Sequence, residues 1–228
     1  MSEFWSYDMR FLTFAATAAL GFLAASQAQA TLVSLGDCTG GISCTITSTP
    51  PNPVSQNPND RTLLAWNEKQ NFVLTERLRV DRVFDTNASF VSSAGGGDYF
   101  LEVGTIVSSH YIQWDNDGSG SDRIQTTIGL DSQIFAFITA DQNLFDSDYL
   151  GLPGLDYADF NLRGLENSDT TIFNGSDVDI DWTASSPGDW TRLITAYSPS
   201  AEVPVPAALP LLLGAFGALG AMRRRRRT

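Results

Sequence analysis

The sequence predicts an all-β fold, a β-sandwich or jelly-roll-like domain, on three observations. Short runs rich in β-branched and aromatic residues recur about every 8 to 15 residues, separated by Gly, Asn, Asp and Ser. No part of the central region keeps a helical period of 3.6 residues, apart from a weak case at residues 63–69. No internal repeat of solenoid or propeller length is present. We therefore expect one β domain at residues 62–200, with shorter segments on either side.

Individual strands are predicted where apolar residues alternate with polar ones or form short continuous runs between turn residues. Residues 94–98 hold three glycines and an aspartate, so they are expected to form a flexible turn. The residues around Asp131 interrupt the longest β-rich stretch. The predicted strands lie at residues 71–75, 78–84, 99–114, 124–139 (broken near Asp131), 157–162, 171–173, 178–182 and 190–196.

Residues 31–61 are predicted to form a disulfide loop followed by a Pro-rich arm. Cys38 and Cys44 are the only cysteines and enclose a Gly-containing segment. In an oxidising compartment such a pair is expected to form a disulfide, which contributes roughly 2 kcal/mol for so short a loop. A metal site would need more ligands nearby, and only Asp37 is available. The proline, asparagine and serine residues at 48–59 indicate an extended arm.

The N-terminal 30 residues have the pattern of a Sec signal peptide. Arg10 precedes an apolar stretch at residues 11–25, and Ala28 and Ala30 form a small-X-small cleavage site. The mature chain is therefore expected to begin at Thr31, to pass through the inner membrane and to function outside the cytoplasm.

The C-terminal segment has three parts in a set order. The residues Val203, Pro204, Val205, Pro206 and Ala207 are expected to be extended, because proline fixes φ and lacks a donor. The apolar run at 208–222 has 15 residues, fewer than the roughly 20 that span a bilayer comfortably. The arginines at 223–227 would stay on the cytoplasmic side. We expect a transmembrane helix that inserts only transiently, with an ordinary tail anchor as the alternative.

This three-part end resembles the PEP-CTERM sorting signals, in the variant with a Val-Pro-X-Pro-Ala motif. The resemblance covers residues 203–228 and implies a Gram-negative bacterium, with processing by an exosortase at or near Val203 to Ala207. The central region also resembles a recurrent secreted domain of such proteins, one without an established activity. That second resemblance rests on the phrases Ala65-Trp66-Asn67-Glu68-Lys69-Gln70, Gly104-Thr105-Ile106-Val107-Ser108-Ser109-His110, Leu162-Arg163-Gly164-Leu165-Glu166 and Ser186-Pro187-Gly188-Asp189-Trp190.

Charge makes nucleic acid an unsuitable partner. The whole chain has a formal charge of −12, but five of its cations are the C-terminal arginines. Residues 31–204 hold 8 Lys and Arg against 24 Asp and Glu, a net charge of −16. Such a surface repels the phosphates of nucleic acid. It favours solubility, and it suits surroundings outside the cell that contain cations.

The most metal-like loop contains Asp115, Asp117, Ser119 and Asp122. Alternating oxygen donors around glycines resemble the first half of an EF-hand-like calcium loop. The twelfth position is Thr126 rather than glutamate, and the flanks look like strands, so a plain hairpin loop is the alternative. Calcium is the candidate cofactor here.

Other carboxylates are less specific. Asp177, Asp179 and Asp181 alternate along a predicted strand and would share one face, where solvent or a cation relieves their repulsion. A second group, Asp141, Asp146 and Asp148, is expected in a loop. Carboxylate pairs suited to glycoside hydrolysis stay open, because sequence does not give their separation.

His110 is the single histidine and lies in a predicted strand, beside serines that lack the context of a nucleophile elbow. We expect it to be structural. Most of the tryptophans and tyrosines are expected in the core, although a few exposed rings would suit sugar stacking.

Taken together, the patterns favour a secreted, non-catalytic surface or extracellular-matrix protein that an exosortase processes. Extracellular polysaccharide is the expected partner in the matrix. A calcium-dependent carbohydrate-binding or adhesive module is the first alternative, and an extracellular hydrolase is the second.

Overall fold

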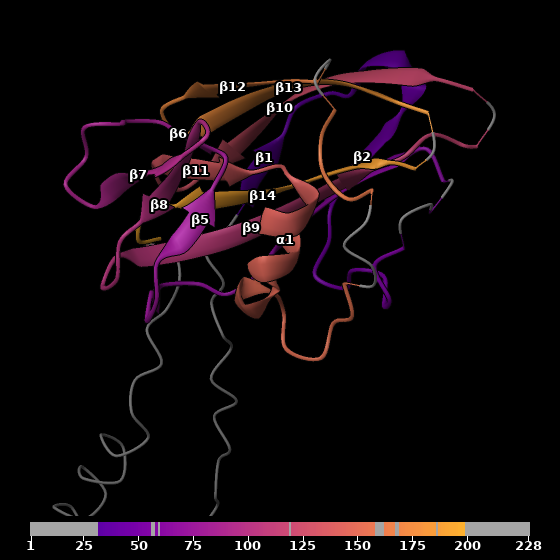
Figure 1. Ribbon diagram of the computed structural model, residues 1–228. Coiled ribbons are helices and arrows are strands. Elements are labelled where there is room, and N and C mark those ends of the chain that lie inside the picture. Colours follow the sequence, from indigo (N-terminus) through magenta and orange to yellow (C-terminus); the bar gives the residue numbers. More distant parts are fainter. Residues whose placement is uncertain are drawn as a thin grey trace, which may run out of the picture.

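The computed structural model describes residues 32–198 except 56, 57, 59, 119, 158–161, 167, 168 and 186, and these residues are mostly β-sheet with few helices (Figure 1). The predicted all-β class is confirmed at this level. The predicted signal peptide at 1–30 and the predicted sorting segment at 203–228 lie outside the described residues. Within the described part of the chain, no helix is long and apolar enough to cross a membrane.

The described residues contain three helical elements and fourteen strands. The helical elements are α1 (Asp141–Asp146) and the 3-10 turns η1 (Thr39–Gly41) and η2 (Asp148–Leu150). The strands are β1 (Leu32–Leu35), β2 (Ser43–Ile46), β3 (Thr62–Asn67), β4 (Phe72–Val73), β5 (Leu78–Val80), β6 (Arg82–Val83), β7 (Val91–Gly95), β8 (Asp98–Leu101), β9 (Ile106–Trp114), β10 (Asp122–Leu130), β11 (Ile134–Ile138), β12 (Thr170–Asn174), β13 (Asp177–Ala184) and β14 (Asp189–Thr195).

Two main sheets and a smaller one contain these strands. The four-stranded sheet has the order β1-β10-β13-β12, and the larger sheet has the order β2-β3-β9-β14-β11-β6, with β4 also paired to β9. The smaller sheet has the order β5-β8-β7. Neighbouring strands are antiparallel in the pairs β10–β13 and β9–β14, whereas β2 and β3 are parallel. The segment 31–61 thus contributes a strand to each main sheet.

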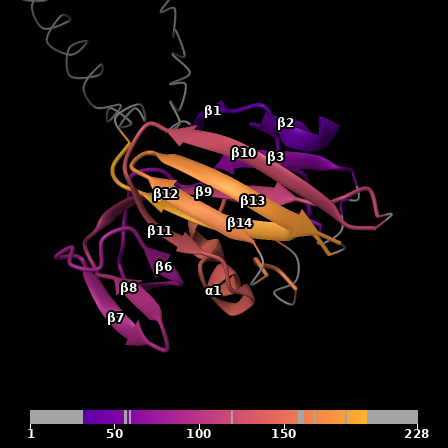
Figure 2. The ribbon, with the colours of Figure 1, turned by 90° about the horizontal axis from the view of Figure 1, so that it is seen from above.

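One face of the larger sheet packs against the four-stranded sheet, and Figure 2 shows β10 and β13 lying over it. The shared core is built from buried side chains of both sheets, among them Ile112 and Trp114 of β9 and Ile124 and Trp182 of β10 and β13. The alternation along β13 explains this placement, because Val178, Ile180 and Trp182 point inward while the aspartates between them point outward.

The opposite face of the larger sheet is also covered. Trp66, Tyr111 and Trp190 pack there against Leu144 of α1, Leu150 of η2 and other apolar residues. Every residue of β14 is therefore buried. A strand that is buried on both faces shows no alternation of polar and apolar residues.

The structure differs from the sequence prediction in two strands. Most of the segment at 63–69, with its weak helical period, belongs to strand β3 (Thr62–Asn67), and the predicted strand at 99–114 is two strands, β8 and β9. They are separated by a turn at Gly104, whose φ is +87°. The predicted strand at 157–162 is not found in its described residues, and α1 lies where a loop was expected.

The predicted disulfide is present. Cys38 and Cys44 are bonded, with their Cα atoms 6.1 Å apart, and the bond spans η1 between β1 and β2. Both cysteines pack at the edge of the core shared by the two main sheets. The disulfide therefore fixes the first two strands to each other.

Candidate functional site

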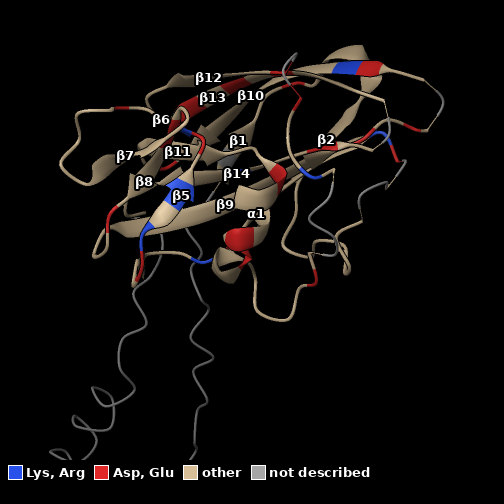
Figure 3. Cartoon of the chain, viewed as in Figure 1, with Lys and Arg blue, Asp and Glu red and all other residues tan. Residues whose placement is uncertain are grey.

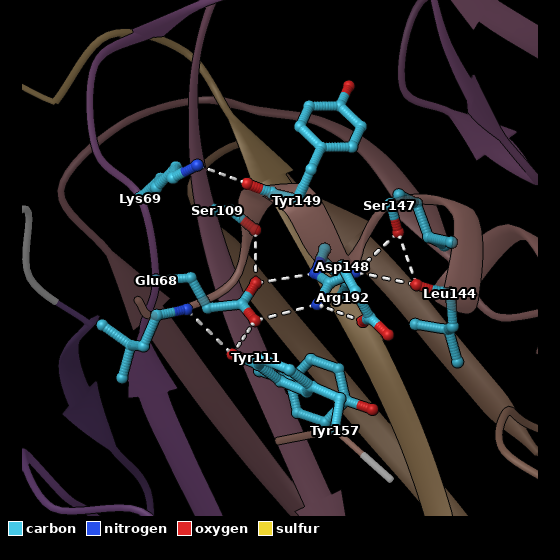
Figure 4. Close-up of polar contacts among 12 residues, drawn as sticks. Glu68, Lys69, Ser109, Tyr111, Leu144, Ser147, Asp148, Tyr149, Tyr157 and Arg192 are labelled. Atoms are coloured by element: carbon cyan, nitrogen blue, oxygen red, sulfur yellow. Dashed lines mark hydrogen bonds and ion pairs between the residues drawn. The ribbon is translucent and has the colours of Figure 1, made fainter. Parts of the chain in front are cut away.

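Glu68 and Arg192 form an ion pair buried on the face of the larger sheet that meets α1 and η2 (Figure 4). Arg192 of β14 donates from Nε and Nη2 to the two oxygens of Glu68, at 2.7 and 2.9 Å, and both side chains are 0 % exposed. Ser109 and Tyr157 donate their hydroxyls to the same carboxylate at 2.5 Å each. Four donors thus surround one buried anion, which is the condition for keeping such a group ionised.

The same guanidinium joins β14 to the helical segment. Arg192 Nη1 donates to the carbonyl of Leu144 at 3.0 Å and to Ser147 Oγ at 2.6 Å. Its Nη2 also lies 3.1 Å from Asp148, whose two oxygens accept from Arg163 at 2.8 and 2.9 Å. Arg163 in turn donates to the hydroxyl of Tyr111 at 3.0 Å. The network therefore links the larger sheet, α1, η2 and the segment after η2.

The pKa values of the buried tyrosines and of Arg192 in this network lie well above neutral pH. Burial raises the pKa of Tyr111 to about 12, although the guanidiniums of Arg163 and Arg192 act in the opposite direction. Burial also raises the pKa of Tyr157, and the Glu68 carboxylate adds to that effect. Burial alone would lower the pKa of Arg192, but Glu68 outweighs it and the pKa lies above its ordinary value. The hydroxyls of Tyr111 and Tyr157 thus stay protonated and Arg192 stays charged at neutral pH.

His110 is fully buried in β9, as a structural histidine would be. One ring nitrogen lies 2.8 Å from Asn67 Oδ1 and the other 3.2 Å from Thr195 Oγ1, so both nitrogens have partners. Burial lowers its pKa to about 4, against the opposing effect of Glu68 and Asp131. The imidazole is therefore neutral at pH 7.

The residues predicted to bind calcium lie in the connection between β9 and β10. Asp115 is buried at the end of β9, Asp117 is exposed, and Asp122 begins β10 and forms an ion pair of 2.9 Å with Arg61. Ser119 lies outside the described residues. The loop is not a hairpin, because β9 and β10 belong to different sheets.

Of the other predicted carboxylates, Asp148 belongs to the network of Arg192, whereas those of β13 lie among the acidic residues of the surface (Figure 3). Asp179 and Asp181 do share the outer face of β13, as predicted, and residues of β10 bind them. Asp179 accepts from Thr127 at 2.6 Å, and Asp181 accepts from Arg123 Nε at 2.6 Å. An open groove of about 430 Å³ lies beside them. These carboxylates already have partners.

A different set of carboxylates comes together at the start of β14. Glu166, Asp169 and Asp189, the acidic cluster, each place one oxygen within 4.8 Å of the others. Glu166 is exposed, Asp169 is half-buried, and Asp189 is buried. A cavity of about 220 Å³ beside them is lined by Asp141, Arg163 and both Glu166 and Asp189. Among the described residues, this cluster is where acidic side chains have the spacing of metal ligands.

Asp189 is the unusual member of the acidic cluster. Its Oδ2 is buried and has no hydrogen-bond partner among the described residues. Burial raises its pKa to about 8, and the negative charges of Asp169, Glu166 and Asp115 act in the same direction. An unsatisfied buried carboxyl group costs free energy, so either a proton or a cation is needed at neutral pH.

The sequence did not point to this cluster. Glu166 and Asp189 both stand in the phrases that carry the resemblance of the central region, two residues after Gly164 and directly after Gly188. Gly164 and Gly188 were the signal for this site in the sequence, since a glycine allows another part of the backbone to approach it closely. A Cβ at Gly164 would meet the carbonyl oxygen of Thr139, and one at Gly188 would meet that of Trp114. The sequence alone did not show that these two segments lie side by side in the fold.

No protein-family model, curated protein or solved structure matches this chain.

Proposed function

We propose that this protein is an exported, non-catalytic β-sandwich protein that an exosortase sorts to the cell surface or extracellular matrix. The sandwich part of the proposal rests on the core that the two main sheets share. The export part rests on the signal-peptide pattern at residues 1–30 and on the ordered motif, apolar run and arginines at 203–228.

The observation that carries the non-catalytic assignment is the network around Glu68. Glu68, Arg192 and Tyr157 are buried, and their charged and hydroxyl groups bind one another or neighbouring residues of the fold. His110 is likewise buried, and both of its ring nitrogens have hydrogen-bond partners. Residues committed to internal contacts in this way hold a domain together, because breaking the contacts would leave buried charges unpaired.

Localisation of sorting-motif variants tests the proposal. In a Gram-negative host that carries an exosortase, we expect the wild-type chain at the surface or in the medium. The double variant Pro204→Ala/Pro206→Ala should stay with the inner membrane, because the extended motif is lost. Pro199→Ala, which changes a proline just outside the motif, is the matched control and should behave as wild type. Equal surface delivery of the double variant would contradict the proposal.

An extracellular hydrolase is the second candidate, and one observation favours it. The cavity beside the acidic cluster holds Asp141, Glu166 and Asp189, and Asp189 has the raised pKa of a general acid. Retaining glycosidases place their two carboxyl groups about 5–5.5 Å apart. In this protein one oxygen of Glu166 and one of Asp189 lie within 4.8 Å of each other, which is close to that separation. Hydrolysis of chromogenic glycosides by the wild type, and its loss in Asp189→Asn, would favour this function over the first.

The carbohydrate-binding alternative receives less support. Trp66, Trp114, Trp182 and Trp190 are all at most 1 % exposed, so none of these rings is free to stack on a sugar.

A further inference from the structure

We propose that Glu166, Asp169 and Asp189 bind a divalent cation that prefers oxygen ligands, with calcium as the expected ion outside the cell. This goes beyond the proposed function, since sorting to the surface does not depend on it. The site also differs from the loop at residues 115–122, although Asp115 lies close enough to act on Asp189 electrostatically.

Asp189 is held in place by backbone contacts on both sides. It is the first residue of β14 and pairs with Trp114 of β9. The next residue, Trp190, donates its N–H to the carbonyl of Gly164 at 3.2 Å. Gly188 lies directly against the carbonyl of Trp114 and against Asp115, where no side chain would fit. The backbone at Asp189 is therefore fixed on both sides, and its carboxyl group is buried.

Asp169 and Glu166 are preorganised by a turn. Asp169 donates its N–H to the carbonyl of Glu166 at 3.1 Å, and its Oδ2 accepts from the N–H of Glu166 at 3.0 Å. Its Oδ1 accepts from the N–H of Thr183 at 2.8 Å. An ionised carboxylate offers about four lone-pair sites, so both oxygens of Asp169 keep capacity for a cation. The turn fixes the Asp169 ligand before an ion arrives.

The cationic side chain nearest in the cavity is already bound elsewhere. Arg163 lines the same cavity, but its Nη1 and Nη2 donate to Asp148 and Tyr111. Burial raises the pKa of Asp141, and the backbone N–H of Leu162 and the charge of Arg163 only oppose that shift. Burial, with the negative charges of Asp169, Glu166 and Asp115, instead raises the pKa of Asp189 to about 8. An added cation removes that repulsion and supplies the missing partner of Asp189 Oδ2.

The chemistry of the ligands selects the ion. All three are carboxylates, whereas zinc and copper sites use histidine or cysteine, and the cysteines of this chain form a disulfide. Calcium accepts six to eight oxygens in flexible geometry, at about 2.3–2.6 Å. The adjoining cavity leaves room for water molecules to complete the shell. Magnesium, which requires a near-ideal octahedron, is expected to bind more weakly.

Isothermal titration of the chelator-treated full chain with Ca²⁺ tests the site. We expect one ion per chain, and at pH 7 the release of up to one proton from Asp189, visible as a dependence of the heat on the buffer. Asp189→Asn should weaken binding at least tenfold and abolish the proton release. It should still fold, since asparagine resembles the protonated side chain. Asp177→Asn, an exposed aspartate at the far end of β13, is the matched control and should bind as wild type.

Three results would overturn the proposal. The first is no Ca²⁺ binding by the wild type up to about 10 mM, tenfold above the dissociation constants of weak extracellular sites. The second is equal binding by Asp189→Asn with loss of binding in Asp117→Asn, which would place the ion in the loop after β9. The third is a glycosidase activity that depends on Asp189 and persists in chelator. The first two results bear neither on localisation nor on the non-catalytic assignment, so they would overturn the site alone. The third would overturn both the site and the non-catalytic assignment, and would leave the localisation untouched.

Discussion

Removal of the buried charge at Glu68 should destabilise the fold strongly. Glu68→Gln keeps the size of the side chain but leaves Arg192 inside the protein without its main counter-ion. Arg192 would retain only the 3.1 Å contact with Asp148 and neutral acceptors on Leu144 and Ser147. The amide would also turn a donor toward a site that now receives four donors. Breaking one partner of a buried pair costs about 3–5 kcal/mol, and we expect a loss in that range.

Urea denaturation followed by tryptophan fluorescence measures this loss, because Trp66 and Trp190 are buried in the same cluster of apolar residues. The control is Asp98→Asn, which breaks the ion pair between Arg79 and Asp98 at the surface, where Arg79 is 51 % exposed. Exposed pairs contribute about 0–1 kcal/mol. If Glu68→Gln lost no more than this control, the network would not stabilise the fold as argued.

Three further predictions concern β9, β14 and the acidic cluster. In chelator, the stability of the wild type relative to Asp189→Asn should fall as pH rises from about 4 to 8, because folded Asp189 keeps a proton that the unfolded chain releases. The pKa difference of about 4 units sets an upper limit of about 5 kcal/mol on this relative loss. Urea titrations of both proteins across this range measure the difference, and an identical pH profile for both would refute it. Gly188→Ala should lower the free energy of unfolding by about 1–3 kcal/mol, because the added methyl group overpacks against Trp114, and it should also weaken Ca²⁺ binding. Ser185→Ala, which changes an exposed neighbour, should alter neither property. A melting temperature of Gly188→Ala equal to that of the wild type would contradict the close approach at this glycine. The ring signals of His110, the single histidine, should not shift in NMR spectra between pH 5.5 and 8, while a midpoint near 6.5 would show that the ring reaches solvent.

The strands that the sequence predicted best are those with one solvated face. In β13 the aspartates at 177, 179 and 181 alternate with apolar residues, so the period of two is plain. In β3 every residue is buried or half-buried, so the run from Thr62 shows no clear period of two and gave only a weak helical signal. Helix α1 is six residues long and was missed because one and a half turns give no measurable period.

The sites were harder to predict than the strands, because their residues are far apart in the chain. Glu68 and Arg192 are 124 positions apart and meet only because β3 and β14 both pair with β9. Glu166 and Asp189 likewise meet through the contact between Gly164 and Trp190. The loop at 115–122 was predicted to bind calcium because its oxygen donors lie close together in the sequence. Sequence spacing did not show that Asp115 is buried or that Asp122 pairs with Arg61.

The central claim is that this domain is exported and released from both of its terminal segments. Intact-mass spectrometry of the protein recovered from the surface of an exosortase-bearing host tests it most directly. The account predicts a chain that begins at Thr31 and ends within the motif Val203 to Ala207. A recovered chain that still carries the apolar run at 208–222 and the arginines at 223–227 would contradict it.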